Sequence, residues 1–249
     1  MISAIVLAAG KGVRMNSELP KVLVPFKGQP MVEYVLDALA QAGVDKPVVV
    51  VGYKSELVES TLKADNRNNR WSGLTFTLQK EQKGTADAAW SAYDALKDFD
   101  GPVIVLAGDQ PLTSSRTIKR MLDQWQEDPC ACLIGTLETD SPFGFGRILR
   151  NENGDFVGIV EEKDATDEQR KIREVNLSYY VFNAADLWDA IKEVKPNNAQ
   201  GEYYLTDCPA VLIKRGKRVI AKILLEQQET YSINTAQQLK EAEERFADR

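Results

Sequence analysis

The chain opens with a short apolar segment that leads directly into glycines. Residues 5–9 are Ile-Val-Leu-Ala-Ala, and Gly10 and Gly12 follow. A continuous apolar run of this length is typical of a buried parallel strand, and open α/β sheets bind ligands at the carboxyl ends of such strands. Glycines at that edge let backbone N–H groups approach an anion closely. The opening therefore favours an α/β fold with an anion-binding turn after its first strand.

Three cationic side chains accompany this turn, at Lys11, Arg14 and Lys21. They can neutralise a bound phosphate, or they can form a solvated surface beside an ordinary strand-to-helix turn. The known glycine-rich fingerprints do not decide between the two. Met15 stands where a dinucleotide-binding loop has its third glycine, and the Gly-Lys-Ser/Thr of a Walker A loop is missing. Taken alone, the turn leaves both interpretations open.

Composition restricts the possible chemistry. The 249 residues contain no histidine, which excludes histidine-dependent hydrolases and His-Glu-x-x-His metalloproteases. Cys130, Cys132 and Cys208 are too few for a disulfide framework and lack partners for a zinc site, so we expect reduced thiols in the core. Carboxylates, amides, cations and a metal ion remain, and this set suits phosphoryl or nucleotidyl transfer.

The chain is acidic, with a net charge of −6 and no long basic stripe, which argues against nucleic acid as a partner. No apolar run is long enough to cross a bilayer, and the first one lacks a charged leader and a cleavage site. We therefore expect a cytoplasmic protein with no membrane partner. Because no linker or repeat interrupts the sequence, we expect one domain over residues 1–249, with two closely joined halves at about 1–140 and 141–249.

Strands and helices are predicted to alternate in the first half, as in β-α-β units. Strands are expected at 47–53, 74–79, 102–107 and 131–136, and helices at 31–42, 55–62, 84–96 and 113–126, with a surface loop at 65–70. The second half has a more antiparallel character, since Asn153-Gly154 favours a hairpin turn. There we expect strands at 147–149, 158–162, 174–182 and 218–225, and helices at 185–193, 202–213 and 237–246.

Two positions after predicted strands have candidate ligands. Asp109 follows the strand at 102–107, where its carboxylate can hold a divalent cation against phosphate, or can begin a turn with Pro111. Gly84 and Thr85 offer backbone groups and a hydroxyl to a base edge, although a plain helix cap explains them equally well. Neither position is decisive by itself.

Taken together and in order, these segments are similar to the N-acetylglucosamine-1-phosphate uridyltransferases, which usually form the first half of a bifunctional protein. The similar blocks lie at 7–10, 19–23, 82–86, 108–112, 144–148, 159–166, 198–207 and 233–234. The run Asn-Ala-Gln-Gly-Glu-Tyr-Tyr-Leu-Thr-Asp at 198–207 is the most specific, because other sugar nucleotidyltransferases share only the N-terminal signature. The resemblance implies a three-layer α/β/α, Rossmann-like nucleotide-diphospho-sugar transferase fold with a mixed, mostly parallel sheet.

The resemblance also implies an activity: transfer of UMP from UTP to a sugar 1-phosphate, foremost N-acetylglucosamine 1-phosphate, with Mg2+ as cofactor. It makes Lys21 and Arg14 catalytic, and Asp109 and Asn234 the metal ligands. The nucleotide would be bound by Leu7, Ala8, Ala9, Gly10, Lys21, Gln79, Gly84, Thr85, Gly108 and Asp109. The sugar would be bound by Gly146, Glu161, Asn176, Tyr204 and Thr206. In these terms residues 1–140 are the nucleotide-binding half and 141–249 the sugar-binding half.

The sequence departs from the family pattern at several places. Ala107 stands where the family usually has an aromatic residue, and Leu177-Ser178 replaces Thr-Gly. Both changes fall on the sugar side, so they bear on the acceptor more than on the reaction. The acetyltransferase half, a β-helix through which the family trimerises, does not follow in this sequence, so we expect a monomer or a weak oligomer.

Two alternatives to this function remain. One keeps the reaction and changes the substrates, to another sugar or alcohol phosphate with CTP or dTTP. The other is a non-catalytic regulator that binds a nucleotide sugar.

Overall fold

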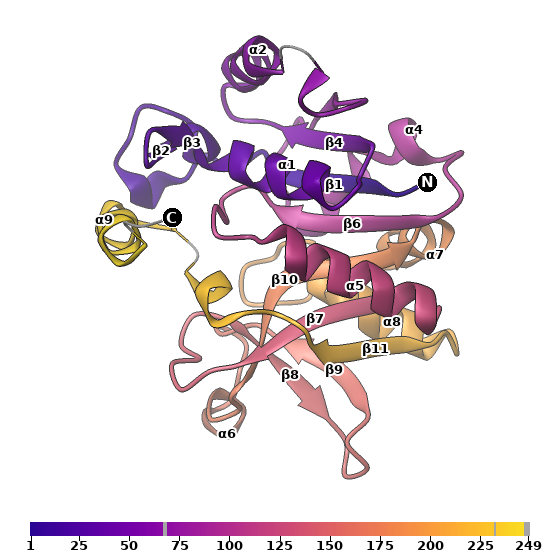
Figure 1. The fold of residues 1–249 in the computed structure, drawn as a ribbon. Helices are drawn as coiled ribbons and strands as arrows, with labels where there is room; N and C mark the ends of the chain where they lie inside the picture. Colours follow the sequence, from indigo (N-terminus) through magenta and orange to yellow (C-terminus); the bar gives the residue numbers. More distant parts are fainter. Residues whose placement is uncertain (67–68, 232, 247–249) are drawn as a thin grey trace.

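The computed structural model describes residues 1–66, 69–231 and 233–246. Within these residues a nine-stranded sheet runs through the molecule (Figure 1) in the order β11-β7-β10-β6-β1-β4-β5, and β8 and β9 extend from β10. The strands are β1 (Ser3–Ala8), β4 (Lys46–Val51), β5 (Thr75–Leu78), β6 (Pro102–Ala107), β7 (Cys132–Glu138), β8 (Gly146–Arg150), β9 (Phe156–Val160), β10 (Glu174–Asn183) and β11 (Val219–Ile223).

Strand direction divides most of the sheet as the sequence predicted, although β11, expected in the more antiparallel half, pairs in parallel with β7. The first strand, β1, is central and pairs in parallel with β4 and β6, and β5 adds in parallel at the edge. In contrast, β10 is antiparallel to β6, β7 and β8, and β8 forms an antiparallel hairpin with β9 across the expected Asn153-Gly154 turn. The prediction of a mixed, mostly parallel sheet in an α/β fold is confirmed.

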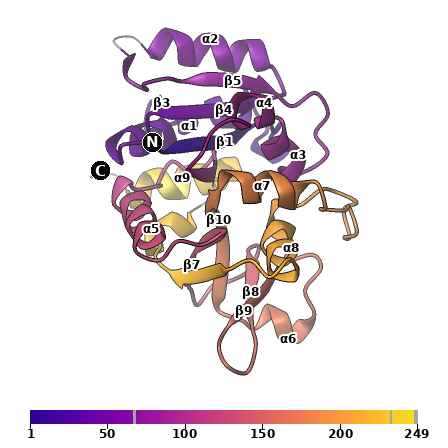
Figure 2. The ribbon, with the colours of Figure 1, turned by 90° about the vertical axis from the view of Figure 1, so that its right-hand side faces the viewer.

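Helices cover both faces of the sheet, because successive residues of a buried strand point to opposite sides. Val6 of β1 packs toward one face and Ile5 toward the other. The first face is covered by α1 (Met31–Gln41), α2 (Ser55–Asp65) and α5 (Ser115–Glu127). The second is covered by α3 (Thr85–Trp90), α4 (Tyr93–Leu96), α7 (Ala184–Ile191) and α8 (Cys208–Lys214), and Figure 2 shows α5 and α8 on opposite sides of the sheet.

A third, smaller apolar cluster joins the two ends of the chain. The terminal helix α9 (Ala236–Arg245) packs beside the short strands β2 (Pro25–Phe26) and β3 (Gln29–Pro30) through Phe26, Met31, Ile233 and Ala242. Figure 1 shows α9 beside β2 and β3, and Asn234, which precedes α9, accepts hydrogen bonds from Lys21 and Arg14. The terminal segment can therefore reach the turn that follows β1.

The structure differs from the sequence prediction in several helices. The helix expected at 84–96 is interrupted between α3 and α4. The helix expected to open at 202 begins only at Cys208, after a 3₁₀ turn (Leu205–Asp207), because the backbone of Tyr203 is hydrogen-bonded to Lys83 and Ala86 instead. Helix α6 (Asp167–Arg170) was not predicted. Of the expected loop at 65–70, Asp65 belongs to α2, and residues 67–68 lie outside the described residues.

Two further expectations can be compared with the structure. Cys130, Cys132 and Cys208 are buried and free, as predicted. No helix in the described part of the chain has the length and apolarity needed to span a bilayer.

Candidate active site

A cleft of about 480 Å³ opens at the carboxyl ends of β1 and β6, between the two halves of the chain. The predicted site residues that line it are Leu7, Ala9, Gly10, Lys21, Gln79, Gly84, Thr85, Asp109, Glu161, Tyr204 and Thr206. They come from segments up to about two hundred positions apart, and the fold brings them to one edge of the sheet. The cleft has the location that the first strand and its glycines indicated.

Four of the remaining predicted residues lie behind or beside the cleft. Ala8 is buried in the core under α1, and the N–H of Gly108 donates to the carbonyl of Leu7 at 2.9 Å. Arg14 and Asn234 line a neighbouring cavity of about 450 Å³. They therefore approach the predicted phosphate end of the cleft from its outer side.

Lys21 is the centre of a charged cluster at one end of the cleft. Its Nζ forms an ion pair with the carboxylate of Asp109 and donates to Oδ1 of Asn234 at 2.7 Å. Nη2 of Arg14 donates to the same Asn234 oxygen at 3.2 Å. The four residues to which the family resemblance gave catalytic and metal-binding roles thus lie together, although 220 positions separate Arg14 from Asn234.

Gly12 has a different role from the one that the sequence suggested. It lies at φ +67°, and a Cβ there would collide with the Lys21 side chain. Only glycine allows the turn to pack against Lys21 in this way. Gly12 therefore positions the lysine. Gly10 instead lines the cleft, and a Cβ on it would meet no atom within 4 Å.

The donor set at this end suits a hard divalent cation. The carboxylate of Asp109 and the amide oxygen of Asn234 both approach one positive charge, the Lys21 ammonium. Oxygen ligands of this kind, few in number, are what Mg2+ uses when it keeps several waters and binds phosphates. Two oxygens that already share one cation are close enough together to share another.

The predicted base-binding end is built from two segments that hydrogen-bond to each other. Gln79 is buried, and its Nε2 donates to the carboxylate of Asp87 at 2.8 Å. Gly84 lies at φ +123°, where a Cβ would collide with the backbone of Tyr203. The hydroxyl of Thr85 accepts from the N–H of Leu205 at 2.9 Å, so it joins the two halves in addition to lining the cleft.

The predicted sugar end centres on the half-buried carboxylate of Glu161. Desolvation raises the pKa of Glu161, and a hydrogen bond from the Thr206 side chain opposes that shift. Gly146 lies beside this carboxylate but does not line the cleft; a Cβ there would be 3.0 Å from Cγ2 of Ile159 and in ordinary contact, at 3.6 Å, with Oε1 of Glu161. A carboxylate held in this way can accept hydrogen bonds from the hydroxyls of a sugar.

Asn176 does not lie where a sugar-binding residue is expected. It is buried and does not line the cleft; its Nδ2 donates to the Tyr180 hydroxyl at 2.8 Å, and its Oδ1 accepts from the N–H of Ser178 at 3.2 Å. Its amide supports the wall of the cleft, and Ser178 is the nearby residue that lines the space.

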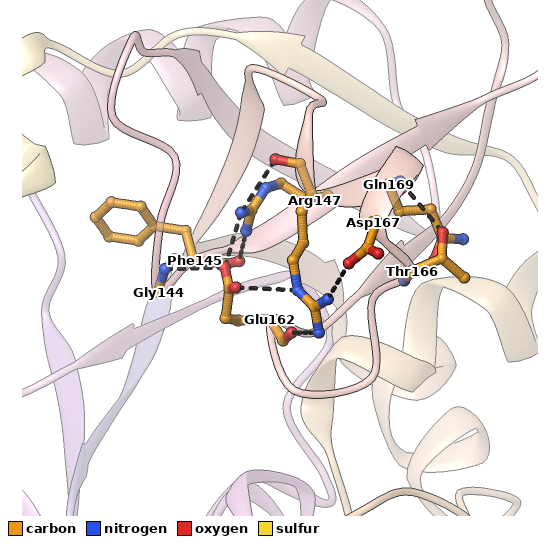
Figure 3. A network of polar contacts seen from close by, with 8 residues as sticks. Gly144, Phe145, Arg147, Glu162, Thr166, Asp167 and Gln169 are labelled. Atoms are coloured by element: carbon orange, nitrogen blue, oxygen red, sulfur yellow. Dashed lines mark hydrogen bonds and ion pairs between the residues drawn. The ribbon is translucent and has the colours of Figure 1, made fainter.

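A network of ionic contacts braces the loop beside Glu161 (Figure 3). Arg147 is 1% exposed, and its guanidinium bonds to the carbonyl of Phe145 and to Glu162 at 2.7 Å. Glu162 also accepts from the N–H of Gly144 at 3.0 Å and pairs with Arg170 at 3.4 Å. Desolvation raises the pKa of Glu162, but the hydrogen bonds from the Gly144 N–H and the Arg147 guanidinium lower it by more. The pKa of Glu162 is therefore below its ordinary value.

Sequence reasoning missed several residues of the cleft, notably Ser178, Gln82 and Gln200. A signal was present for Ser178, because Leu177-Ser178 departs from the family pattern. Arg147 lies in the similar block at 144–148 but received no role, and an arginine next to the apolar residues Ile148 and Leu149 could have indicated a buried ion pair.

The fold and the cleft define the class of the protein: it is a nucleotidyltransferase enzyme. The chain belongs to the family of the MobA-like NTP transferase domain, whose model matches residues 4–202.

Curated relatives support the resemblance found in the sequence. The chain is 42% identical to the bifunctional protein GlmU of Brevibacillus brevis, over 97% of this chain and 51% of that protein. It is 41% identical to the bifunctional protein GlmU of Streptococcus mutans, over 96% of this chain and 50% of that protein. The chain thus spans about half the length of the curated relatives it matches, and the match lies in their N-terminal half.

Solved structures share the fold. A UDP-glucose pyrophosphorylase crystallised with UDP-glucose superposes with a TM-score of 0.80 over 99% of both chains, at 19% identity. A putative glucose-1-phosphate thymidylyltransferase from Bacillus anthracis, in complex with a sucrose, gives 0.79 over 100% of this chain and 96% of that chain, at 20% identity. At this level of identity the two structures support the fold alone.

Proposed function

We propose that this chain transfers UMP from UTP to a sugar 1-phosphate, with N-acetylglucosamine 1-phosphate as the leading acceptor, giving UDP-N-acetylglucosamine and diphosphate. The observation that carries the proposal is one cleft lined both by the cationic cluster around Lys21 and by the half-buried carboxylate of Glu161. The similarity to GlmU proteins over nearly the whole chain supports the choice of substrates.

The reaction needs no protein nucleophile. An oxygen of the sugar phosphate attacks the α-phosphorus of UTP in line, and the bond from that phosphorus to the bridging oxygen breaks. The bond electrons leave with diphosphate. Lys21 and Arg14 would neutralise the charge that develops on the phosphoryl oxygens, and preorganised cations of this kind stabilise such transition states strongly.

Members of this family typically use a divalent metal. We propose Mg2+, held by Asp109 and Asn234, which would supply further charge neutralisation at the phosphates. Asp109 and Asn234 are also the partners of the Lys21 ammonium, so a metal ion held by their oxygens would leave that ammonium available to a phosphate.

The remaining assignments follow the two ends of the cleft. We propose that Gln79, Gly84, Thr85 and the backbone of residues 7–10 bind the nucleotide, and that Glu161, Tyr204 and Thr206 bind the sugar. The single domain, with a nucleotide-binding and a sugar-binding half, and the cytoplasmic location remain part of this proposal.

A second candidate keeps the reaction and changes the acceptor. It is favoured by Ala107 and Ser178, which line the cleft and depart from the family pattern. Another sugar 1-phosphate would then replace N-acetylglucosamine 1-phosphate.

The test is diphosphate release from purified protein with Mg2+ and UTP. N-acetylglucosamine 1-phosphate, glucosamine 1-phosphate and glucose 1-phosphate are compared as acceptors, with CTP and dTTP as nucleotide controls. We expect the highest kcat/KM with UTP and N-acetylglucosamine 1-phosphate. A clear preference for another acceptor would favour the second candidate, and UTP binding without turnover on any acceptor would indicate the regulator.

A further inference from the structure

Ser178 has a backbone conformation that is unusual for a residue with a side chain. Its φ is +64°, in the left-handed region where glycine is the ordinary residue. It lies in an irregularity of β10: Asn176 pairs with Thr136 of β7, and Tyr179 pairs with the adjacent Gly135. Leu177 and Ser178 are therefore looped out of the ladder. Bulges of this kind redirect side chains and are frequent beside active sites.

The surrounding contacts fix this conformation. Nε2 of Gln110 donates to the carbonyl of Leu177 at 2.8 Å, and the N–H of Ser178 donates to Asn176 at 3.2 Å. Leu177 is itself buried in the core. The bulge is thus held from both sides, so Ser178 cannot relax without the loss of buried hydrogen bonds.

Ser178 lines the cleft, in a wall that also includes Ala107 and Glu161. Glycine would satisfy the backbone here without strain. Strained residues that the structure holds in place cluster at ligand sites, where the inference runs from the observed outlier to a function. A hydroxyl placed in this cleft can donate to and accept from a polyhydroxylated ligand.

We propose that Ser178 is a specificity-determining residue whose hydroxyl hydrogen-bonds to the sugar of the acceptor 1-phosphate, an inference that rests on the proposed function. Its Cβ also narrows the cleft beside Glu161. The side chain lies within hydrogen-bonding reach of the Tyr180 phenol as well, so a purely structural role is the alternative that an experiment must separate.

Two variants separate the roles. Ser178→Ala keeps the Cβ and removes the hydroxyl, and Ser178→Gly also removes the backbone strain. For both we expect kcat/KM for the preferred sugar 1-phosphate to fall roughly 3- to 10-fold, the effect of one lost hydrogen bond, with the KM for UTP unchanged. We also expect the ratio of kcat/KM between the three sugar phosphates to change.

Asn69→Gly serves as the matched control. Asn69 also has a positive φ, of 57°, but lies in an exposed loop away from the cleft, so its replacement should leave the kinetics unchanged. The melting temperature of Ser178→Gly should be no lower than that of the wild type, which shows that any loss is not a loss of folding.

Each other outcome overturns the proposal. If both variants keep the wild-type kinetics and selectivity toward the acceptors, Ser178 does not contact the sugar. An equal loss for all acceptors and for UTP would assign Ser178 a structural role only. Wild-type protein without turnover on any acceptor would contradict the proposed function and this inference together, whereas active wild-type protein with unaffected variants would contradict the inference alone.

Discussion

Two ionic clusters in this molecule use the same kinds of side chain in different surroundings. The cluster of Lys21, Asp109 and Asn234 borders the cleft, and the Asp109 side chain is 25% exposed. The cluster of Arg147 and Glu162 is closed by backbone groups, with the Arg147 side chain 1% exposed. The first joins residues 88 positions apart in the sequence, and the second joins residues 15 positions apart.

The difference lies in which partners can be exchanged. A cation and a carboxylate at the wall of a cleft can give up each other for a phosphate and a metal ion, because the new partners replace the old charges. A guanidinium enclosed by a carbonyl and a carboxylate has no such replacement, since the removal of Glu162 would leave the positive charge of Arg147 buried without its carboxylate. The first cluster is therefore suited to chemistry and the second to holding a loop in place.

The largest effect should follow changes in the cluster at the cleft. Lys21→Ala and Asp109→Ala are each expected to lower the rate of diphosphate release at least ~100-fold, because charge neutralisation at the phosphates is lost. The Lys21 and Asp109 side chains are 11% and 25% exposed, so the free energy of unfolding should fall by about 1–2 kcal/mol, less than for the enclosed cluster. Activity and urea denaturation are measured on the same preparations.

Lys119→Ala is the control for this prediction. Lys119 lies exposed on α5 and does not border the cleft, so its replacement should alter neither rate nor stability. Turnover retained in either Lys21→Ala or Asp109→Ala would contradict the assigned roles.

The enclosed cluster should respond in the opposite way. Arg147→Met is expected to lower the free energy of unfolding by roughly 3 kcal/mol, because Glu162 loses its buried partner. The kcat of the folded fraction should fall much less than in Lys21→Ala. Urea denaturation followed by circular dichroism measures the first effect, and turnover at low temperature the second.

Arg150→Met, on the same strand, is the matched control. Arg150 pairs with Glu174 at 2.7 Å, but its side chain is 31% exposed, so the loss should be below about 1 kcal/mol. Equal destabilisation by the two variants would show that burial does not distinguish them.

A third cluster, on α1, sharpens the comparison through pH. Burial, with Asp65 nearby, raises the pKa of Glu33 to about 7, despite an ion pair with Arg70 at 2.9 Å. Because the folded state then binds a proton that the unfolded chain has released, the unfolding free energy should fall as pH rises from about 4.5 to 7. We expect a loss on the order of 1–3 kcal/mol over this range.

Glu33→Gln isolates that contribution. Its stability should depend less on pH between these limits than that of the wild type, as measured by thermal denaturation in matched buffers. Parallel pH profiles for the two proteins would show that Glu33 titrates near its ordinary pKa.

Much of the fold could be predicted from local patterns. Continuous apolar runs located β1, β4 and β6, and the Asn153-Gly154 turn located the β8–β9 hairpin, because strand burial and turn geometry depend on neighbouring residues. The boundary at Cys208 could not be found in this way. The helical pattern of 202–213 is overridden by hydrogen bonds from Tyr203 to a segment about 120 positions earlier.

The site was predictable to a similar extent and for related reasons. Glycines and charged residues after strands located Lys21 and Asp109, since the carboxyl ends of parallel strands meet at one edge. Asn234 depended on the family resemblance, because nothing local indicates that α9 packs against β2 and β3. The positive φ of Ser178 could not be predicted for the same reason. The bulge at Leu177-Ser178 is held by hydrogen bonds to Gln110 and Asn176, which lie outside these two residues.

The hydrogen bonds between residues 83–86 and 203–205 have a consequence for engineering. The N–H and carbonyl of Tyr203 bond to Lys83 and Ala86 at 2.8 Å each, and the Leu205 N–H bonds to Thr85. A chimera that takes the proposed sugar-binding residues from one relative and the proposed base-binding residues from another would have to restore these hydrogen bonds. Exchange of substrate preference between relatives is therefore expected to require that both segments be transplanted as a pair.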